Sequence, residues 1–217
     1  MSILIDLAAL LSGYLLGSIS FARIVTAVVS PDTDLRGVAA PVEGSEEKLH
    51  MSSISATSVR LKLGARYGCL TSFLDMVKVG LPVAFFEFVL SAQPAAYFAA
   101  IGGLLGHNWP IFYGFQGGYG HSAMYGALFV LNWMAVPLNF FGTALLYGVL
   151  RQVQLALFGG VVLLVPWLWY SEGGILPVGY AVIASGAYLI KILPDFFSQR
   201  AIEKESAAGS PEEAGGP

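Results

Sequence analysis

The sequence contains a single cysteine, Cys69, and only three histidines. One cysteine excludes an intramolecular disulfide and a thiolate cage for a metal. The histidines, His50, His107 and His121, fall in two separate loops. They lack the H-x-x-x-H spacing that would place two imidazoles on one face of a helix. We therefore expect neither a metal site nor a cofactor.

Charge is also scarce. Charged residues make up 12% of the 217 residues, hydrophobic residues make up 56%, and the mean hydropathy is +0.69. Such a composition leaves too little polar surface for a soluble globular protein, and it predicts an all-α polytopic membrane protein. The formal net charge of −3 is spread over loops and tail without a basic patch, so nucleic acid is not an expected partner.

The apolar segments predict seven transmembrane helices. The first exceeds the ~20 residues that cross the hydrocarbon core, and it lacks the basic start and cleavage site of a signal peptide. The seven segments are Ile3–Val29, Tyr67–Leu90, Ala95–Leu105, His121–Leu131, Val136–Tyr147, Leu155–Trp169 and Ile175–Leu193.

Three polar segments interrupt or follow these spans. Residues 30–66 are predicted to form a loop that ends in a short interfacial helix within Met51–Arg66. Residues 106–120 form a second loop. Residues 1–197 are predicted to form the membrane domain. Residues 198–217, which are rich in Ala, Gly, Pro and Glu, are predicted to follow it as a disordered tail.

The basic residues orient these spans. With seven spans, every extramembrane Lys and Arg falls on the side of the 30–66 loop, the 106–120 loop, the Arg151 turn and the C-terminal tail. The turns near 91–94, 132–137 and 171–174 carry none. Because basic loops stay in the cytoplasm, the N-terminus is expected outside and the C-terminus inside.

Two opposite charges, Asp75 and Lys78, lie inside the second predicted span. At i and i+3 they share one helix face. Charges within a span are expensive and normally pair and face the protein interior. We therefore expect a structural ion pair near the base of the 106–120 loop.

The stretch Gly106–Gly120, GHNWPIFYGFQGGYG, is the least lipid-like part of the apolar region. Irregular backbone at membrane depth persists only where protein covers it or where it lines a watery cavity. The consecutive glycines Gly117 and Gly118 allow neighbouring N–H groups to hold an anion such as phosphate. Alternatively, the glycines only allow close helix packing.

Four stretches resemble motifs of one family, the bacterial acyl-phosphate-dependent glycerol-3-phosphate acyltransferases. Gly106–Gly120 resembles the second motif, G-H-x-F-P-x-F-x-x-F-K-G-G-K-G-V-A-T, and His50–Gly68 resembles the first, G-S-G-N-I-G-A-T-N-V-x-R-x-x-G. Leu74–Lys78 resembles L-D-x-x-K-G, and Leu16–Ile19 resembles L-G-S-I-P. The matches keep their order over roughly residues 10–124.

This resemblance implies a seven-span enzyme of the bacterial plasma membrane with its N-terminus outside. Such enzymes transfer a fatty acyl group from acyl phosphate to glycerol 3-phosphate, the opening step of phospholipid synthesis. Membrane lipid, acyl phosphate and glycerol 3-phosphate are then the expected partners. The motif positions provide the candidate substrate-binding residues: Ser52, Ser53, Ser58, Arg60, His107, Gly117, Gly118, Tyr119 and Gly120. For His107, the resemblance favours a loop anchor over a proton-transfer group.

The chain departs from the family at the positions that carry its chemistry. The third motif, H-x-x-N-I-x-R, aligns with Pro194–Arg200, where only the arginine is kept. Losing one preorganised donor commonly slows a reaction roughly 100- to 1000-fold, and here several are lost together. We therefore expect little or no glycerol-3-phosphate acyltransferase activity. The family's polar or charged groups are replaced by Met51, Leu61, Gln116, Tyr119, Pro194 and Phe197.

Two functions stay open on this sequence. One is an active acyltransferase with altered residues. The other is a catalytically inactive relative that acts as a scaffold or subunit of a membrane protein complex. A transporter is disfavoured because only Asp75 and Lys78 are expected deep in a span, where they neutralise each other.

Overall fold

The computed structural model describes residues 3–41, 48–51 and 53–208, and within these ranges the chain forms ten α-helices and one two-stranded sheet. The predicted all-α membrane body is confirmed, whereas the small sheet was not predicted. The elements are α1 (Ile3–Gly17), α2 (Phe21–Val29), β1 (Val38–Pro41), β2 (Lys48–Met51), α3 (Ala56–Leu63), α4 (Ala65–Ala84), α5 (Gln93–Asn108), α6 (His121–Leu131), α7 (Ala135–Leu150), α8 (Val153–Val162), α9 (Leu164–Ser171) and α10 (Ile175–Ala208).

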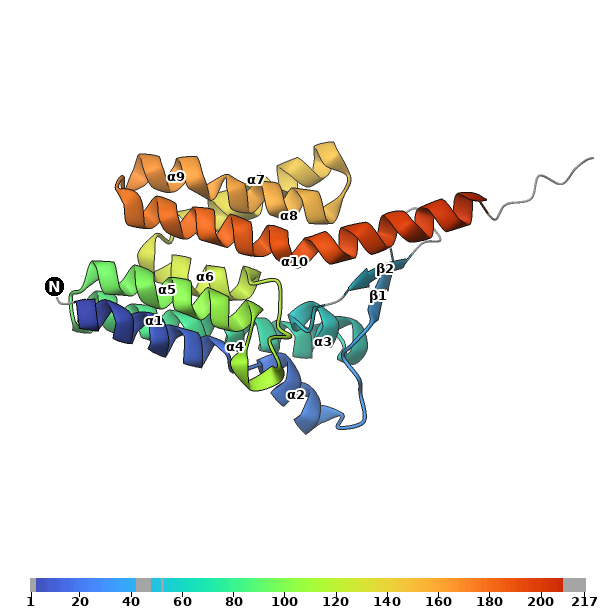
Figure 1. Cartoon of the computed structure of the whole chain (residues 1–217), viewed down its shortest axis with the longest axis horizontal. Coiled ribbons are helices and arrows are strands. Elements are labelled where there is room, and N and C mark those ends of the chain that lie inside the picture. The colour runs from blue at the N-terminus through green and yellow to red at the C-terminus, as the bar shows by residue number, and fades with distance from the viewer. Residues whose placement is uncertain (1–2, 42–47, 52, 209–217) are drawn as a thin grey trace, which may run out of the picture.

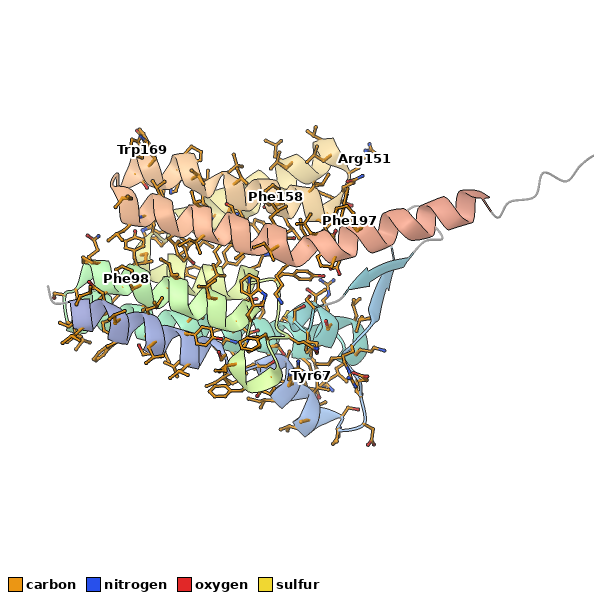
Figure 2. The ribbon with its side chains drawn as sticks, viewed as in Figure 1. Tyr67, Phe98, Arg151, Phe158, Trp169 and Phe197 are labelled. Carbon is orange, nitrogen blue, oxygen red and sulfur yellow. The ribbon has the colours of Figure 1, made fainter. Side chains whose placement is uncertain are left out.

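The helices lie side by side, and α10 runs between two groups (Figure 1). One group contains α1, α4, α5 and α6, and the other contains α7, α8 and α9. The N-terminus and the turn between α9 and α10 lie at one end of the bundle. The sheet, α3 and the C-terminal part of α10 lie towards the other end. Arg151 is labelled at that second end and Trp169 at the first (Figure 2).

Four helical segments of the described chain are long and apolar enough to cross a membrane: Ile3–Val29, Ala65–Val89, Val153–Ser171 and Ile175–Phe197. Two shorter apolar helices, α6 and α7, accompany them. The chain is thus built as a multi-pass membrane protein. The count of seven spans stays a prediction.

The first apolar segment is not one continuous helix. After α1 ends at Gly17, Ser20 takes an extended conformation, with φ −93° and ψ 95°, before α2 begins. Figure 1 shows α2 leaving the direction of α1. The apolar pattern does not reveal this break, because hydrophobic residues continue across it.

Helices α1 and α5 pack backbone against backbone. A Cβ atom added at Gly13 would collide with the backbone of Ala99, and one added at Gly17 with the backbone of Gly103. Two small residues four positions apart on each helix therefore face each other, which is the small-xxx-small pattern of membrane helix pairs. Such close approach replaces the hydrophobic driving force, which lipid does not provide between helices.

Several segments outside the long helices differ from their predicted boundaries. Within the 30–66 loop, β1 pairs with β2 in antiparallel register, and α3 is the predicted short helix. Residues 106–108 belong to α5, so the irregular loop begins at Trp109. Helix α10 continues to Ala208, past the predicted start of the tail at residue 198. Its apolar face ends near residue 197, but a helix needs no buried face to continue in good helix formers such as Glu, Lys and Ala. Residues 209–217 lie outside the described part.

At the end that holds the N-terminus, polar side chains connect three helices. Tyr97 of α5 donates a hydrogen bond to Glu172, and Asn132 Nδ2 donates another to Glu172 Oε1 over 2.6 Å. Trp167 Nε1 donates to Asn132 Oδ1 over 3.3 Å. These bonds link the turn after α6 to α5 and α9, so they fix the bundle end opposite the glycine-rich loop.

The backbone contact between α1 and α5 predicts that Gly13→Ala destabilises the protein. The added methyl meets the Ala99 backbone, which cannot rotate away, and overpacking of this kind costs about 1–3 kcal/mol. Gly186→Ala in α10 is the matched control, because no atom lies within 4 Å of its added Cβ. That control should be neutral or slightly stabilising, since alanine favours helix over glycine. Thermal unfolding of the detergent-solubilised protein measures both, and equal shifts would contradict the packing argument.

The distribution of basic residues predicts that the C-terminus is cytoplasmic. A reporter fused after Gly216 should show cytoplasmic activity, because Arg151 and the end of α10 lie at the same end of the bundle. The same reporter inserted at Gly173, in the turn between α9 and α10, should show the opposite location. An external signal at both positions, or an internal signal at both, would overturn the predicted topology.

Candidate functional site

The backbone of the glycine loop, Trp109–Gly120, accepts hydrogen bonds from several other elements. Each bond ends on a carbonyl of the loop. Gly117, Gly118 and Gly120 are buried, whereas much of residues 111–116 is exposed. The donors come from α1, α2 and the segment before α3: Tyr14 Oη to Trp109 O (2.9 Å), Arg23 Nη2 to Gln116 O (2.8 Å) and Ile54 N to Gly117 O (3.2 Å).

Close packing on His107 explains the paired glycines. A Cβ atom at Gly118 would collide with the His107 ring, and one at Gly117 would collide with the His107 carbonyl. The Gly118 N–H donates to that same carbonyl over 3.2 Å. Gly120 has a φ of +95°, a conformation that favours glycine. The loop therefore uses Gly117 and Gly118 for packing, and the Gly118 N–H is bonded within the protein rather than directed at an anion.

Asp75 and Lys78 form the predicted interior ion pair. Lys78 Nζ lies 2.7 Å from Asp75 Oδ1, and both side chains are almost fully buried. His107 Nδ1 lies 3.6 Å from the same carboxylate oxygen, beneath the loop. Lys78 also donates to the carbonyl of Ile19 over 2.5 Å, at the break between α1 and α2. The buried ion pair thus joins α4 to the end of α5 and to the break in the first apolar segment. His107 lies between the ion pair and the glycine loop, which packs against its ring.

A small cavity lies beside this ion pair, between the α1–α2 break and the loop. Its lining includes Ser18, Ser20, Lys78, His107 and Gly118. It has room for roughly one water molecule. A phosphorylated three-carbon substrate is far larger, so binding at this place requires the loop and the break to move apart.

The serines of the first motif have different roles. Ser58 is fully buried, and its Oγ donates to the Ser53 carbonyl over 2.9 Å, which fixes the start of α3. Ser53 is 4% exposed and lies beside the hydroxyl of Tyr119. Arg60 is exposed, and its Cβ packs where Gly68 lacks a side chain. Ser52 lies outside the described residues. Of the described candidates from this motif, Ser53 is the one that lies at the glycine loop.

Tyr119, which stands at a lysine position of the second motif, donates a hydrogen bond to Asp195. Asp195 belongs to α10 and is 1% exposed. Burial and this hydrogen bond raise the pKa of Tyr119 well above its usual range, although neighbouring Ser53 opposes the shift. Tyr119 therefore remains a protonated hydroxyl at any physiological pH. The sequence prediction missed Asp195 as a partner of the loop.

Helix α10 directs three polar side chains towards the loop, at positions 188, 191 and 195. The Tyr188 ring lies 6.1 Å from the Tyr119 ring, centroid to centroid. Lys191 Nζ lies 5.3 Å from the centroid of the Trp109 ring. Lys191 and Asp195 thus lie within the apolar segment Ile175–Phe197, in addition to the expected charges Asp75 and Lys78 in α4. The spacing of these residues at i, i+3 and i+7 on one helix face was the signal that could have revealed them.

Charged side chains therefore reach the loop from α10 as well as from the motif in α4 that contains Asp75 and Lys78. Lys78 is paired with Asp75, while Lys191 and Asp195 present one cation and one carboxylate one helical turn apart. Within the described residues, no group of three or more His, Cys, Asp or Glu side chains is placed to hold a metal ion. The arrangement suits binding of a single anionic group beside a hydroxyl.

A sequence model of the family described as glycerol-3-phosphate acyltransferase matches residues 7–195. The chain belongs to the glycerol-3-phosphate acyltransferase family. It is 31% identical over 177 residues to the glycerol-3-phosphate acyltransferase of Anaeromyxobacter dehalogenans, across 80% of this chain and 82% of the relative.

Other relatives of the glycerol-3-phosphate acyltransferase family match a shorter part of their length. The Aquifex aeolicus protein is 34% identical over 121 residues, which cover 55% of this chain and 56% of the relative. The Mycoplasma mycoides protein is 30% identical over 169 residues, which cover 74% and 61%. The chain thus spans less than two thirds of the length of these two relatives.

Solved structures of the family share the fold. The crystal structure of PlsY, an integral membrane glycerol 3-phosphate acyltransferase, in its glycerol 3-phosphate form has a TM-score of 0.73 to this chain, with 23% identity over 94% of this chain and 92% of that one. The lysophosphatidic acid form has a TM-score of 0.71, with 22% identity over 90% and 92%. With its four long apolar helical segments, this member of the glycerol-3-phosphate acyltransferase family is a multi-pass integral membrane protein. This agrees with the bacterial plasma membrane location expected from the sequence.

The buried ion pair predicts that Lys78→Met destabilises the protein more than Asp75→Asn combined with Lys78→Met. The single change leaves the Asp75 carboxylate buried without its nearest cation, a loss of about 3–5 kcal/mol. The double change removes both charges. Unfolding in detergent, with exposed Lys62→Met as control, measures the difference. A double variant that loses the sum of both single losses would contradict the pairing.

Proposed function

We propose that this chain acts at the glycine loop as a membrane acyltransferase that uses acyl phosphate and for which glycerol 3-phosphate is a poor acceptor. The site lies at the end of the bundle that holds α3 and the sheet, which is the cytoplasmic end in the proposed topology. That topology has seven spans with the N-terminus outside, supported by the one-sided distribution of Lys and Arg. A water-soluble acceptor and a lipid-tailed donor can meet only at such an interface.

The reaction class makes a specific demand on the site. The hydroxyl of the acceptor attacks the acyl carbon, an ester C–O bond forms, and the C–O bond to phosphate breaks. The hydroxyl proton leaves with the phosphate, so acyl phosphate and alcohol give an ester and inorganic phosphate. Because negative charge gathers on the acyl and phosphoryl oxygens, the site must provide fixed cations or hydrogen-bond donors there.

The observation that carries the proposal is the hydrogen bond from Tyr119 to buried Asp195. It stands at the loop where the family motif has a lysine. A phosphate brought to this point meets a carboxylate, which repels each unit of phosphate charge by roughly 3 kcal/mol at ~5 Å and an effective dielectric constant of ~20. Nearby Lys191 offsets part of this repulsion. Glycerol 3-phosphate is a dianion, so this repulsion acts on both of its phosphate charges.

Activity with glycerol 3-phosphate is therefore expected to be at least ~100-fold lower than that of the Aquifex aeolicus relative. The test compares both purified proteins with acyl phosphate and glycerol 3-phosphate, and expresses each in a strain that lacks its own enzyme. Little turnover and no rescue by this chain are expected. Rescue at ordinary expression would refute the proposal.

Tyr119→Lys alone should not restore activity. The new ammonium would lie beside the Asp195 carboxylate that Tyr119 contacts now and would pair with it instead of binding phosphate. Groups that act as a unit are also strongly non-additive. Recovery to the rate of the relative from this one substitution would show that the missing lysine is the whole defect.

The alternative of an inactive scaffold or subunit predicts a different pattern. Such a protein would show no turnover with any acceptor, and substitutions at the glycine loop would leave its cellular role unchanged. The loss of several family donors favours this alternative, whereas retention of a polar, partly closed site at the loop favours the first proposal. Turnover with acyl phosphate and a panel of alcohols distinguishes them.

A further inference from the structure

The last helix carries a lysine without a close ion pair in the described part of the chain. Lys191 is half-buried within the apolar part of α10, where a charged side chain is costly. Among the described side chains, it forms no ion pair within 4.0 Å. Its counterpart Lys78, by contrast, is paired with Asp75. An unpaired ammonium in such a place is a functional candidate by default.

The surroundings of Lys191 place it at the glycine loop. Its Nζ lies 5.3 Å from the centroid of the Trp109 ring, the first residue of the loop. It is close enough to His107 and to Asp195 for their charges to interact. The lysine therefore reaches from α10 to the start of the loop.

We infer that Lys191 is the cation that binds a phosphate group in this chain, and that Asp195, one turn further along α10, competes with that phosphate. The inference rests on the proposed function, because it names the residues on which phosphate binding at this site depends. The ligand is a phosphate or phosphate monoester presented at the membrane interface.

The chemistry of the two residues supports these opposite roles. A lysine ammonium is a compact charge with three donors and binds phosphate as a point charge. Asp195 is an internal anion fixed next to it, bonded to Tyr119. Asp195 and a bound phosphate therefore compete for the same ammonium group.

The test measures binding of three probes to the full-length protein in detergent: inorganic phosphate, glycerol 3-phosphate and dodecyl phosphate in micelles. Trp109 reports binding through its fluorescence, since phosphate would neutralise the ammonium above its ring. Loss of the signal in Trp109→Phe identifies it among the four tryptophans.

Three variants distinguish a binding role from a structural one. Lys191→Met should weaken binding at least 10-fold, and Asp195→Asn should strengthen it about 3- to 10-fold. Arg151→Asn is the charge control. It removes one positive charge at the same end of the bundle, and asparagine tolerates the left-handed backbone found there. It should bind like the unmodified protein. Circular dichroism confirms that each variant is folded.

Opposite shifts for Lys191→Met and Asp195→Asn support the inference, because structural damage would weaken binding in both. Unchanged binding in Lys191→Met, weaker binding in Asp195→Asn, or no binding of any probe would overturn it. Binding of soluble phosphate indicates a soluble ligand, and binding of dodecyl phosphate alone indicates a lipid-anchored one; both support the site. Fast turnover of glycerol 3-phosphate would refute the proposed function. The role of Lys191 in phosphate binding would still be decided by the binding measurements alone.

Discussion

The buried ion pair of Asp75 and Lys78 is the constraint on which the site depends. The pair lies inside the apolar helix α4 and contacts two other parts of the chain. Asp75 lies beside His107 at the end of α5, and Lys78 donates to the Ile19 carbonyl at the break between α1 and α2. Removing charge from water is unfavourable unless geometry and further polar contacts compensate. Here those contacts are the end of α5 and the break between α1 and α2. Gly117 and Gly118 of the glycine loop pack against His107, which lies beside Asp75. The position of the loop therefore depends on the ion pair.

A loop that is fixed in this way has little freedom left for binding. Its glycines are used for close packing, its carbonyls accept hydrogen bonds from neighbouring elements, and the Gly118 N–H is occupied. Charge for a substrate must therefore come from side chains that reach the loop from elsewhere. In this member of the glycerol-3-phosphate acyltransferase family, we infer that α10 provides that charge through Lys191, while Asp195 opposes it. Because the fold is set by helix packing and the charge by a few side chains on one helix face, substrate preference can change without a change of fold.

The sequence allowed some of these features to be predicted. Asp75 and Lys78 were found because two charges in an apolar span must pair and face inward, and four ordered motifs revealed the family. Other features depend on tertiary contacts that no local pattern encodes. The break at Ser20 interrupts a continuous apolar run and is stabilised by Lys78, 59 residues from Ile19. The bond from Tyr119 to Asp195 joins residues 76 positions apart. Lys191 was visible within the last apolar span, but its direction became clear only from the contact with Trp109.

We infer that α10, and not the glycine loop, provides the cation for the substrate phosphate. A structure of the protein crystallised with arsenate is the sharpest test, because anomalous scattering marks the position of this phosphate-like anion. We expect a peak within hydrogen-bond distance of Lys191 Nζ. A peak held by Arg60 or by the backbone N–H groups of Gly117 to Gly120, away from Lys191, would contradict it.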